Sequence, residues 1–318
     1  MIPITILLPV KNGEQFLAGA IEMISQNVAM QDEIVVVDDY SDDGTARILK
    51  NWQSSDHRVI IAKPEKGGLV DALNLGIRIS SHQWIARFDV DDFYHPDRLS
   101  FQRRSIDSAT VAIFSDYKFV DSAGKISLGV IPTGVSASAT SVSLINGLRT
   151  PHPSVLFRRE AAIEAGFYRN QDLYCEDLSL WLRLSRLGNL ITVPETLLGY
   201  RIQSKSVSIV NGKKSKSNKQ KVIEEIGINF QDLYNLREEI EATLECYEEL
   251  KFSTRRTLLL LMDLLQATKV QKKPSKDCIF RIVKKCNMQQ RFSILNEFNT
   301  LYFETVNRRK YRDSRKFS

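Results

Sequence analysis

Acidic side chains gather at three points of the sequence where they could do chemistry. Asp38-Asp39 follows one apolar run, Asp89-Val90-Asp91-Asp92 follows a second, and Glu176-Asp177 begins an amphipathic segment. Hard divalent cations such as Mg²⁺ and Mn²⁺ prefer carboxylate oxygens, and a bound cation neutralises the charge of a departing diphosphate. We expect Asp91 to be the first metal ligand and Asp92 a second contact.

Carboxylates also meet two other needs of such a site. An ionised carboxylate accepts hydrogen bonds from the hydroxyl groups of a ribose, which suits Asp89, or from the N–H of a uracil-type base, which suits Asp39. Transfer of a group to a hydroxyl needs a general base that removes the hydroxyl proton. Asp177 is the candidate for that base.

Each acidic cluster also has a plain structural explanation. Asp38 and Asp39 precede one helical segment and Asp92 precedes another, and carboxylates at such places cap free N–H groups. Glu176 and Asp177 begin a helix, where an acidic side chain stabilises the helix dipole by about 0.3–1 kcal/mol. Capping stays open for the three aspartates, whereas the presence of all three clusters in one chain favours function for the Glu-Asp pair.

Histidines and cysteines give a weaker signal. His152, between Pro151 and Pro153, is either a contact of the site or a packed loop residue, and the other histidines are interpreted as surface or structural residues. The cysteines are scattered, with no C-x-x-C pair and no spacing that suits zinc. They are interpreted as reduced structural thiols of a cytoplasmic protein: Cys175, Cys246, Cys278 and Cys286.

Apolar runs alternate with helical periodicity over the first half of the chain. Residues 4–10 and 34–37 read as buried parallel strands, and residues 14–29 between them have helical spacing, which predicts a β-α-β unit. The same alternation continues, so that Asp89 follows a strand end, where open α/β sheets bind ligands. Further strands are expected at 59–61, 84–88, 111–114 and 190–193, and further helices from 45 to 52, at 70–80, after 95–97 and at 177–187.

The second half of the chain changes character. Residues 122–143 are rich in Ser, Gly and Thr, which predicts hairpins and a long loop over the site. We expect the α/β domain to span 1–208, and residues 209–221, whose end (211–221) lacks apolar residues, to be a basic linker. Residues 222–318 have helical periodicity and predict a basic helical C-terminal domain.

Composition and charge narrow the class of protein. The hydrophobic fraction of 43% with 26% charged residues is typical of a globular protein, and no apolar run is long enough to span a membrane. Residues 205–318 hold 24 Lys and Arg against 14 Asp and Glu, a net charge of about +10, whereas residues 1–204 carry about −4. This asymmetry favours peripheral contact with an anionic membrane at its cytoplasmic face.

Seven segments together resemble the inverting family 2 glycosyltransferases of the GT-A fold. The resemblance covers roughly residues 3–202, and the segments occur in the order of the family: ILLPVKNGEQFLAGAI, EIVVVDDYSDDGT, KGGLVDALNLGI, WIARFDVDDFYHPDRL, TPHPSVLFRRE, YCEDLSLWLRL and YRI. A short acidic motif alone is a weak signal, but seven segments with matching spacing are specific. The resemblance implies a GT-A (Rossmann-like) α/β domain with a mixed, mainly parallel sheet.

The resemblance also implies roles for individual residues. Pro9 and Val10 would line the base pocket with Asp39, and Asp89 would hold the ribose. Mn²⁺ or Mg²⁺ would bind at Asp91, with Asp177 as the general base. Further contacts would come from Glu176 toward the acceptor or sugar, from Lys66, Gly68 and Asn74 toward the uridine and phosphate, and from Arg87 beside the diphosphate.

The resemblance implies a glycosyltransferase that uses a nucleotide diphosphate sugar, with UDP favoured, and a glycan or lipid-linked acceptor in the synthesis of lipopolysaccharide, capsule or another surface polysaccharide. Many relatives have a histidine two residues after the Tyr-Arg pair, where this chain has Gln203, so a histidine metal ligand is not expected there. A pyrophosphorylase or dehydrogenase would need a glycine-rich loop after the first strand, which residues 9–14 do not provide. The alternative is a catalytically idle domain whose basic tail binds a membrane or nucleic acid; for the enzyme, no nucleic-acid partner is expected.

Overall fold

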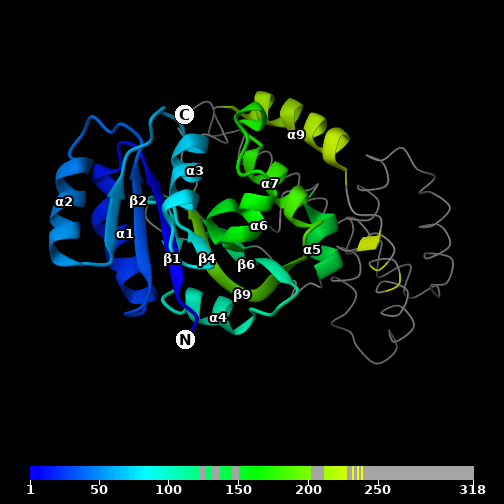
Figure 1. The fold of residues 1–318 in the computed structure, drawn as a ribbon, viewed down its shortest axis with the longest axis horizontal. Helices are drawn as coiled ribbons and strands as arrows, with labels where there is room; N and C mark the ends of the chain where they lie inside the picture. Colours follow the sequence, from blue (N-terminus) through cyan, green and yellow to red (C-terminus); the bar gives the residue numbers. More distant parts are fainter. Residues whose placement is uncertain are drawn as a thin grey trace.

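The computed structural model describes residues 1–121, 126–129, 137–144, 150–201 and 211–227, and the single residues 231, 232, 235 and 238. Within them the chain forms a curved sheet with helices on both faces (Figure 1). The strands are β1 (Ile4–Val10), β2 (Glu33–Asp38), β3 (Val59–Ala62), β4 (Trp84–Arg87), β5 (Phe93–Tyr94), β6 (Thr110–Val120), β7 (Ile126–Gly129), β8 (Leu156–Arg158) and β9 (Asn189–Arg201). The helices are α1 (Glu14–Asn27), α2 (Thr45–Ser55), α3 (Leu69–Ile79), α4 (Arg98–Arg104), α5 (Ala137–Ser143), α6 (Arg159–Glu164), α7 (Glu176–Leu184) and α9 (Gly212–Ile226), with short 3₁₀ turns η1 (His152–Ser154) and η2 (Asn170–Asp172).

The sheet is mixed and mainly parallel. Its order within the described residues is β3-β2-β1-β4-β8-β6-β9-β5, and β7 pairs with β6. Strands β3, β2, β1 and β4 are parallel neighbours, and β6 is parallel to β9, whereas β8 runs antiparallel between β4 and β6. This arrangement confirms the fold class that the sequence predicts.

Alternating side chains of the parallel strands divide the core into two layers. In β1, Leu7 packs on one face, whereas Ile6 and Leu8 pack on the other, as the period of two in a strand requires. The face of Leu7 is covered by α3, α5, α6, α7 and α9, and the opposite face by α1, α2 and α4. Strands β1 and β2 are therefore buried on both faces, which is why the centres of both read as apolar runs.

Two predicted elements differ from the structure in the middle of the chain. The strand expected at 190–193 continues through Pro194 to Arg201, because its register with β6 shifts between Ser115 and Asp116. Such a bulge accommodates a proline that cannot donate to the ladder. Residues 126–129 pair with β6 as an expected hairpin, but 137–143 form the buried helix α5 rather than loop, because its small side chains pack closely on β9.

The predicted linker is wrong over residues 212–221, which are the first part of helix α9. The polar start of this helix hides its nature, but Val222, Ile223 and Ile226 at its end are buried in the core cluster that α7 also joins. Helix α9 therefore packs against the α/β domain, so the packed part of the chain extends beyond residue 208. The other predicted C-terminal helices lie outside the described residues. Within the described part, no helix is long and apolar enough to cross a membrane.

Candidate functional site

Three neighbouring parallel strands end at the same edge of the sheet. Val10 at the end of β1 lies opposite Asp38 of β2, and the N–H of Asp39 donates to the Val10 carbonyl oxygen at 2.8 Å. On the other side of β1, Leu7 lies opposite Arg87, the last residue of β4. The carboxyl ends of parallel strands are where such sheets bind ligands, so Asp39 and the segment after Arg87 share one candidate site.

Asp39 is held by the start of α3. Its side chain is buried, its Oδ1 accepts the N–H of Gly68 at 2.7 Å, and its Oδ2 lies 3.8 Å from Nζ of Lys11. Gly68 has φ of +126°, a conformation that only glycine adopts without strain. The carboxylate of Asp39 is therefore fixed at the edge of the sheet by a backbone donor and a nearby cation.

The capping explanation separates Asp38 from Asp39. Oδ1 of Asp38 accepts the N–H of Ser41 at 3.0 Å and closes the turn that precedes α2. Helix α2 itself begins after Gly44, and the oxygens of Asp39 point to Gly68 and Lys11 instead. Asp38 thus shapes the loop before α2, whereas Asp39 does not cap α2 and instead accepts the N–H of Gly68 at the start of α3.

Asp89, Asp91 and Asp92 form an acidic triad just after β4. One carboxylate oxygen from each lies within 4.8 Å of the others. Asp89 accepts a hydrogen bond from a guanidinium nitrogen of Arg87 at 2.7 Å, and Asp92 accepts the backbone N–H of Arg201 at 2.8 Å. Because Asp92 bonds to β9 and α4 begins after Asp97, Asp92 is not the cap of that helix.

The triad has the geometry and charge that a hard cation needs. Oxygens bound to one Mg²⁺ or Mn²⁺ lie roughly 2.0–2.6 Å from the ion, so pairs of ligand atoms are separated by up to about 4–5 Å. Burial, followed by the charge of Asp89, raises the pKa of Asp91 to about 6. Burial and the neighbouring carboxylates also raise the pKa of Asp92. This excess of negative charge fits a divalent ion.

Two buried arginines, Arg87 and Arg98, hold the end of β4 that precedes the triad. Arg87 is 3% exposed; burial alone would lower its pKa, but the charge and hydrogen bond of Asp89 outweigh burial and raise it. Arg98 of α4 is fully buried and donates to the carbonyl oxygens of Arg87 at 3.0 Å and Val155 at 3.1 Å. These bonds join the end of β4 to the segment after η1.

Arg201 closes the triad from β9. Its backbone N–H binds Asp92, its Nε donates to the carbonyl oxygen of Asp91, and its guanidinium lies 4.4 Å from the ring centre of Phe93. The resemblance includes the Tyr-Arg-Ile segment but does not reveal this contact, because Arg201 is 109 residues from Asp92. Gln203, the position at which no histidine metal ligand is expected, lies outside the described residues.

Glu176 and Asp177 occupy the first turn of α7, and Glu176 is only 8% exposed. Its Oε2 is buried without a hydrogen-bond partner among the described residues. Burial, then the charge of Asp177, raises the pKa of Glu176 to about 7, and burial raises that of Asp177. A carboxylate that served only the helix dipole would be solvated, so this burial favours a role beyond the helix dipole.

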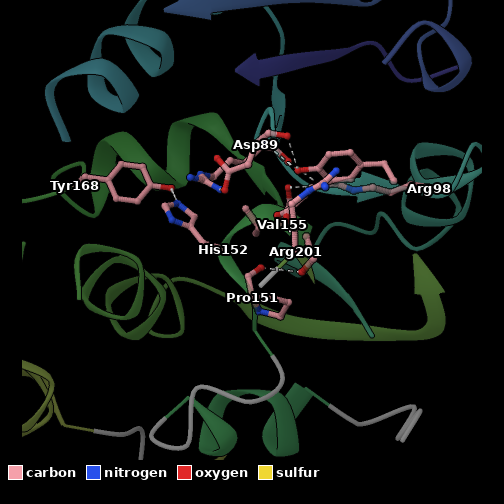
Figure 2. Close-up of polar contacts among 11 residues, drawn as sticks. Asp89, Arg98, Pro151, His152, Val155, Tyr168 and Arg201 are labelled. Carbon is pink, nitrogen blue, oxygen red and sulfur yellow. Dashed lines mark hydrogen bonds and ion pairs between the residues drawn. The ribbon is translucent and has the colours of Figure 1, made fainter. Parts of the chain in front are cut away.

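A histidine and a tyrosine contact each other within reach of the charge of Arg87. Figure 2 shows the Tyr168 hydroxyl pointing at the His152 ring, and Nε2 of His152 lies 2.8 Å from that oxygen. Burial, then the charge of Arg87, lowers the pKa of His152 well below its usual range. Burial raises the pKa of the Tyr168 hydroxyl. Of the neighbouring charges, Arg87 lowers this pKa, whereas the carboxylates raise it: Asp177, Glu176 and Asp89. His152 is thus a packed, neutral residue in contact with Tyr168.

The remaining predicted residues have different surroundings. The side-chain amide of Asn74 binds the backbone of Tyr168 in both directions, at 2.9 and 3.0 Å, so it acts on the site through Tyr168. Lys66 is exposed in the loop before α3. Pro9 and Val10 are buried in β1, and Val10 packs in the core layer of α1. Sequence reasoning missed Tyr168, Arg98 and Arg201, whose partners are distant in the sequence.

The sheet and its acidic edge define a GT-A-type α/β glycosyltransferase fold. TarS of S. aureus (residues 1–349, in complex with UDP-GlcNAc) has a TM-score of 0.59 and 14% identity, over 98% of this chain and 92% of that chain. A mannosyltransferase from Pyrobaculum calidifontis, in complex with GDP-Man and Mn²⁺, has a TM-score of 0.54 and 12% identity, over 98% and 84% of the two chains. At these identities the likeness establishes the fold alone.

Sequence relatives identify the family. The profile described as Glycosyl transferase family 2 matches residues 5–162. The amylovoran biosynthesis glycosyltransferase AmsE of Erwinia amylovora is 29% identical over 214 residues, 65% of this chain and 79% of that protein. An uncharacterized glycosyltransferase of Rickettsia prowazekii is 26% identical, over 63% of this chain and 64% of its own length. The chain belongs to glycosyl transferase family 2 and is a glycosyltransferase.

Proposed function

We propose that the protein transfers a sugar from a nucleotide diphosphate, with UDP favoured, to an acceptor hydroxyl with inversion at the anomeric carbon. The observation that carries the proposal is the grouping of Asp89, Asp91 and Asp92 at the end of β4, with Arg87 acting electrostatically on this triad and on the Glu176-Asp177 pair. The two acidic groups have the chemistry of a metal-diphosphate site and of an acceptor site.

The donor would lie along the edge formed by β1, β2 and β4. Asp39, beside Pro9 and Val10, would accept the N–H of a uracil-type base, and Asp89 would accept the ribose hydroxyls. Arg87 would face the diphosphate, next to the loop that contains Lys66 and Gly68, while Asn74 would hold Tyr168 in place. The UDP-GlcNAc in the TarS complex favours UDP, whereas the mannosyltransferase complex contains GDP-Man.

Asp91 and Asp92 would hold Mn²⁺ or Mg²⁺. When bound, the ion supplies positive charge beside the diphosphate as the bond between the anomeric carbon and the phosphate oxygen breaks. The Pyrobaculum mannosyltransferase binds Mn²⁺ together with GDP-Man, which supports manganese as the first ion to test.

Asp177 would accept the proton of the acceptor hydroxyl while the hydroxyl oxygen forms its bond to the anomeric carbon. Attack from the face opposite the diphosphate is a single displacement and inverts the configuration. Glu176 would bind the acceptor or the sugar beside it. The amylovoran role in the name of AmsE supports a glycan or lipid-linked acceptor in surface polysaccharide synthesis at the cytoplasmic side of a membrane.

Calorimetric titration with UDP, dTDP, GDP and CDP, each with and without Mn²⁺, tests the donor site. We expect manganese-dependent binding of UDP, weakened at least about tenfold in Asp91→Asn, because the variant loses a charged metal ligand. Binding of no nucleotide would contradict the proposal and favour a catalytically idle domain.

Asp177→Asn is the matched variant in the other acidic group. It should bind UDP with Mn²⁺ about as tightly as the wild type and lose about 10²–10⁴-fold in transfer rate, because the amide cannot accept the acceptor proton. Normal transfer by this variant would remove Asp177 from the role of base, and equal loss of nucleotide binding would place it in the donor site instead.

A further inference from the structure

Helix α9 carries one lysine within a stripe of residues that faces the α/β domain. Val222, Ile223 and Ile226 are 3%, 4% and 8% exposed and belong to the core. One and two turns earlier, Lys219 and Ser215 continue this stripe at helical spacing. The carbonyl oxygen of Ser215 lies 3.2 Å from the thiol of Cys175, so the stripe faces α7 there as well.

The stripe lies against the segment that leads into α7. The side-chain amide of Asn218 donates to the carbonyl oxygen of Leu173 at 2.8 Å, and Ser215 contacts Cys175. Figure 1 shows α9 running beside α7. Lys219, one turn after Ser215 and one turn before Ile223, lies on this face of α9, and its charge acts on Asp177 in the first turn of α7.

Lys219 is half-buried and makes no hydrogen bond or ion pair with the residues that the structure describes. Burial lowers the pKa of its ammonium, whereas the charges of Cys175 and Asp177 raise it. The effect is mutual, since the ammonium in turn lowers the pKa of Asp177. A cation placed in a core-facing stripe costs desolvation energy, which its attraction to a buried carboxylate offsets in part.

Among the described residues, two cations act on Asp177. The larger effect is that of Arg87, whose guanidinium is hydrogen-bonded to Asp89, and the second is that of Lys219. Lys219 is the cation near Asp177 that the described structure leaves outside any ion pair. The charged and titratable groups that face Asp177 are Glu176 and Cys175 on its own segment, Arg87 from β4, Tyr168 after α6, and Lys219 from α9.

We propose that Lys219 is a positioning residue that holds the Asp177 carboxylate in its ionised form, ready to accept the acceptor proton. This inference rests on the proposed role of Asp177 as general base. It also gives a function to α9, whose basic, polar start otherwise has no evident reason to be packed on the catalytic side of the domain.

The test is the pH dependence of kcat/KM for Lys219→Met. The activity of the wild type should rise with pH as Asp177 loses its proton. Loss of the neighbouring positive charge should move this rise to higher pH by about one unit, so that activity is about tenfold lower on the acidic side and near the wild-type value at high pH. Lys219→Arg, which keeps the charge, should retain the wild-type profile.

Lys216→Met is the matched control, because Lys216 is an exposed lysine on the same helix and should leave the profile unchanged. Calorimetric binding of UDP with Mn²⁺ by Lys219→Met should match the wild type, and its free energy of unfolding in urea should be no lower than that of the wild type, which shows that the donor site and the fold are intact. An unshifted profile would overturn the inference. A uniform loss at every pH with a raised KM for the acceptor would also overturn it, and would assign Lys219 to acceptor binding. Absence of transfer by the wild type would contradict the proposed function itself, and this inference with it.

Discussion

Arg87 lies where two groups of carboxylates meet. It is almost fully buried, it is hydrogen-bonded to Asp89, and its charge lowers the pKa of Glu176 and Asp177. Its Nε has no partner among the described residues. A buried guanidinium with one donor left unpaired lowers the stability of the fold.

The raised pKa of Glu176 should make the stability of the protein depend on pH. This pKa is raised to about 7, so the neutral form contributes stability that is fully present below the ordinary pKa of 4.5 and is lost as pH rises through about 7. We expect Glu176→Gln to increase the free energy of unfolding by about 1–3 kcal/mol at about pH 8 and by much less near pH 5. Urea unfolding at the two pH values measures the difference.

Glu160→Gln is the control for this prediction. Glu160 also lies in the first turn of a helix, α6, but its side chain is 61% exposed. Its replacement should change stability by less than about 0.5 kcal/mol at either pH. If Glu176→Gln gave no more stability at high pH than this control, the buried carboxylate would not be strained.

The residues of the site could be predicted from the sequence only in part. Asp39 and the triad follow strand ends, and the structure brings the strand ends together as parallel pairing requires. Tyr168 could not be predicted, because its place depends on Asn74, which is 94 positions away. Whether Asp38 and Asp92 cap a helix or serve the site depended on their hydrogen-bond partners. These partners, Ser41 and Arg201, are identified only by the folded structure.

At the scale of elements, strongly apolar segments were predictable and segments with mixed signals were not. β1 and β2 are buried on both faces and therefore read clearly. Pro194 concealed the length of β9, and the small residues of α5 resembled a loop. In α9 the apolar side chains are confined to the last third of the helix, and the polar, basic residues before them indicated a linker. The information that fixes these elements lies in their packing partners.

Two glycines in helices test how closely α3 approaches β1. A Cβ on Gly76 would lie 2.1 Å from Cδ1 of the buried Leu7, whereas a Cβ on Gly19 of α1 would meet nothing within 4 Å. Gly76→Ala should therefore destabilise the protein by about 1–3 kcal/mol through overpacking. Gly19→Ala should stabilise it by about 0.5–1 kcal/mol, because alanine is the better helix former. Urea unfolding of both variants measures the contrast, and equal effects would show that Leu7 moves freely.

At the scale of the whole molecule, charge is divided unevenly along the chain. Residues 205–318 carry a net charge of about +10, and residues 1–204 about −4. A basic segment is attracted to an anionic membrane by about 1 kcal/mol for each Lys or Arg near the surface. The proposed lipid-linked acceptor would be presented at such a membrane.

Flotation of the full chain with vesicles tests this attraction. We expect the protein to float with vesicles that contain phosphatidylglycerol, to float much less with neutral phosphatidylcholine vesicles, and to be released as salt is raised, because the attraction is electrostatic. Equal recovery with both kinds of vesicle would indicate apolar rather than electrostatic attachment, and no flotation at moderate salt would exclude a membrane-docking role.

The packing of α9 also has a consequence for the synthesis of the protein. Val222, Ile223 and Ile226 belong to the same apolar cluster as Val35 and Val37 of β2. A nascent chain that has emerged only as far as β9 thus exposes the part of α7 that α9 covers, and contacts between segments so far apart form late. The core layer on this face of the sheet is therefore sealed from water only when α9, one of the last described helices, has emerged.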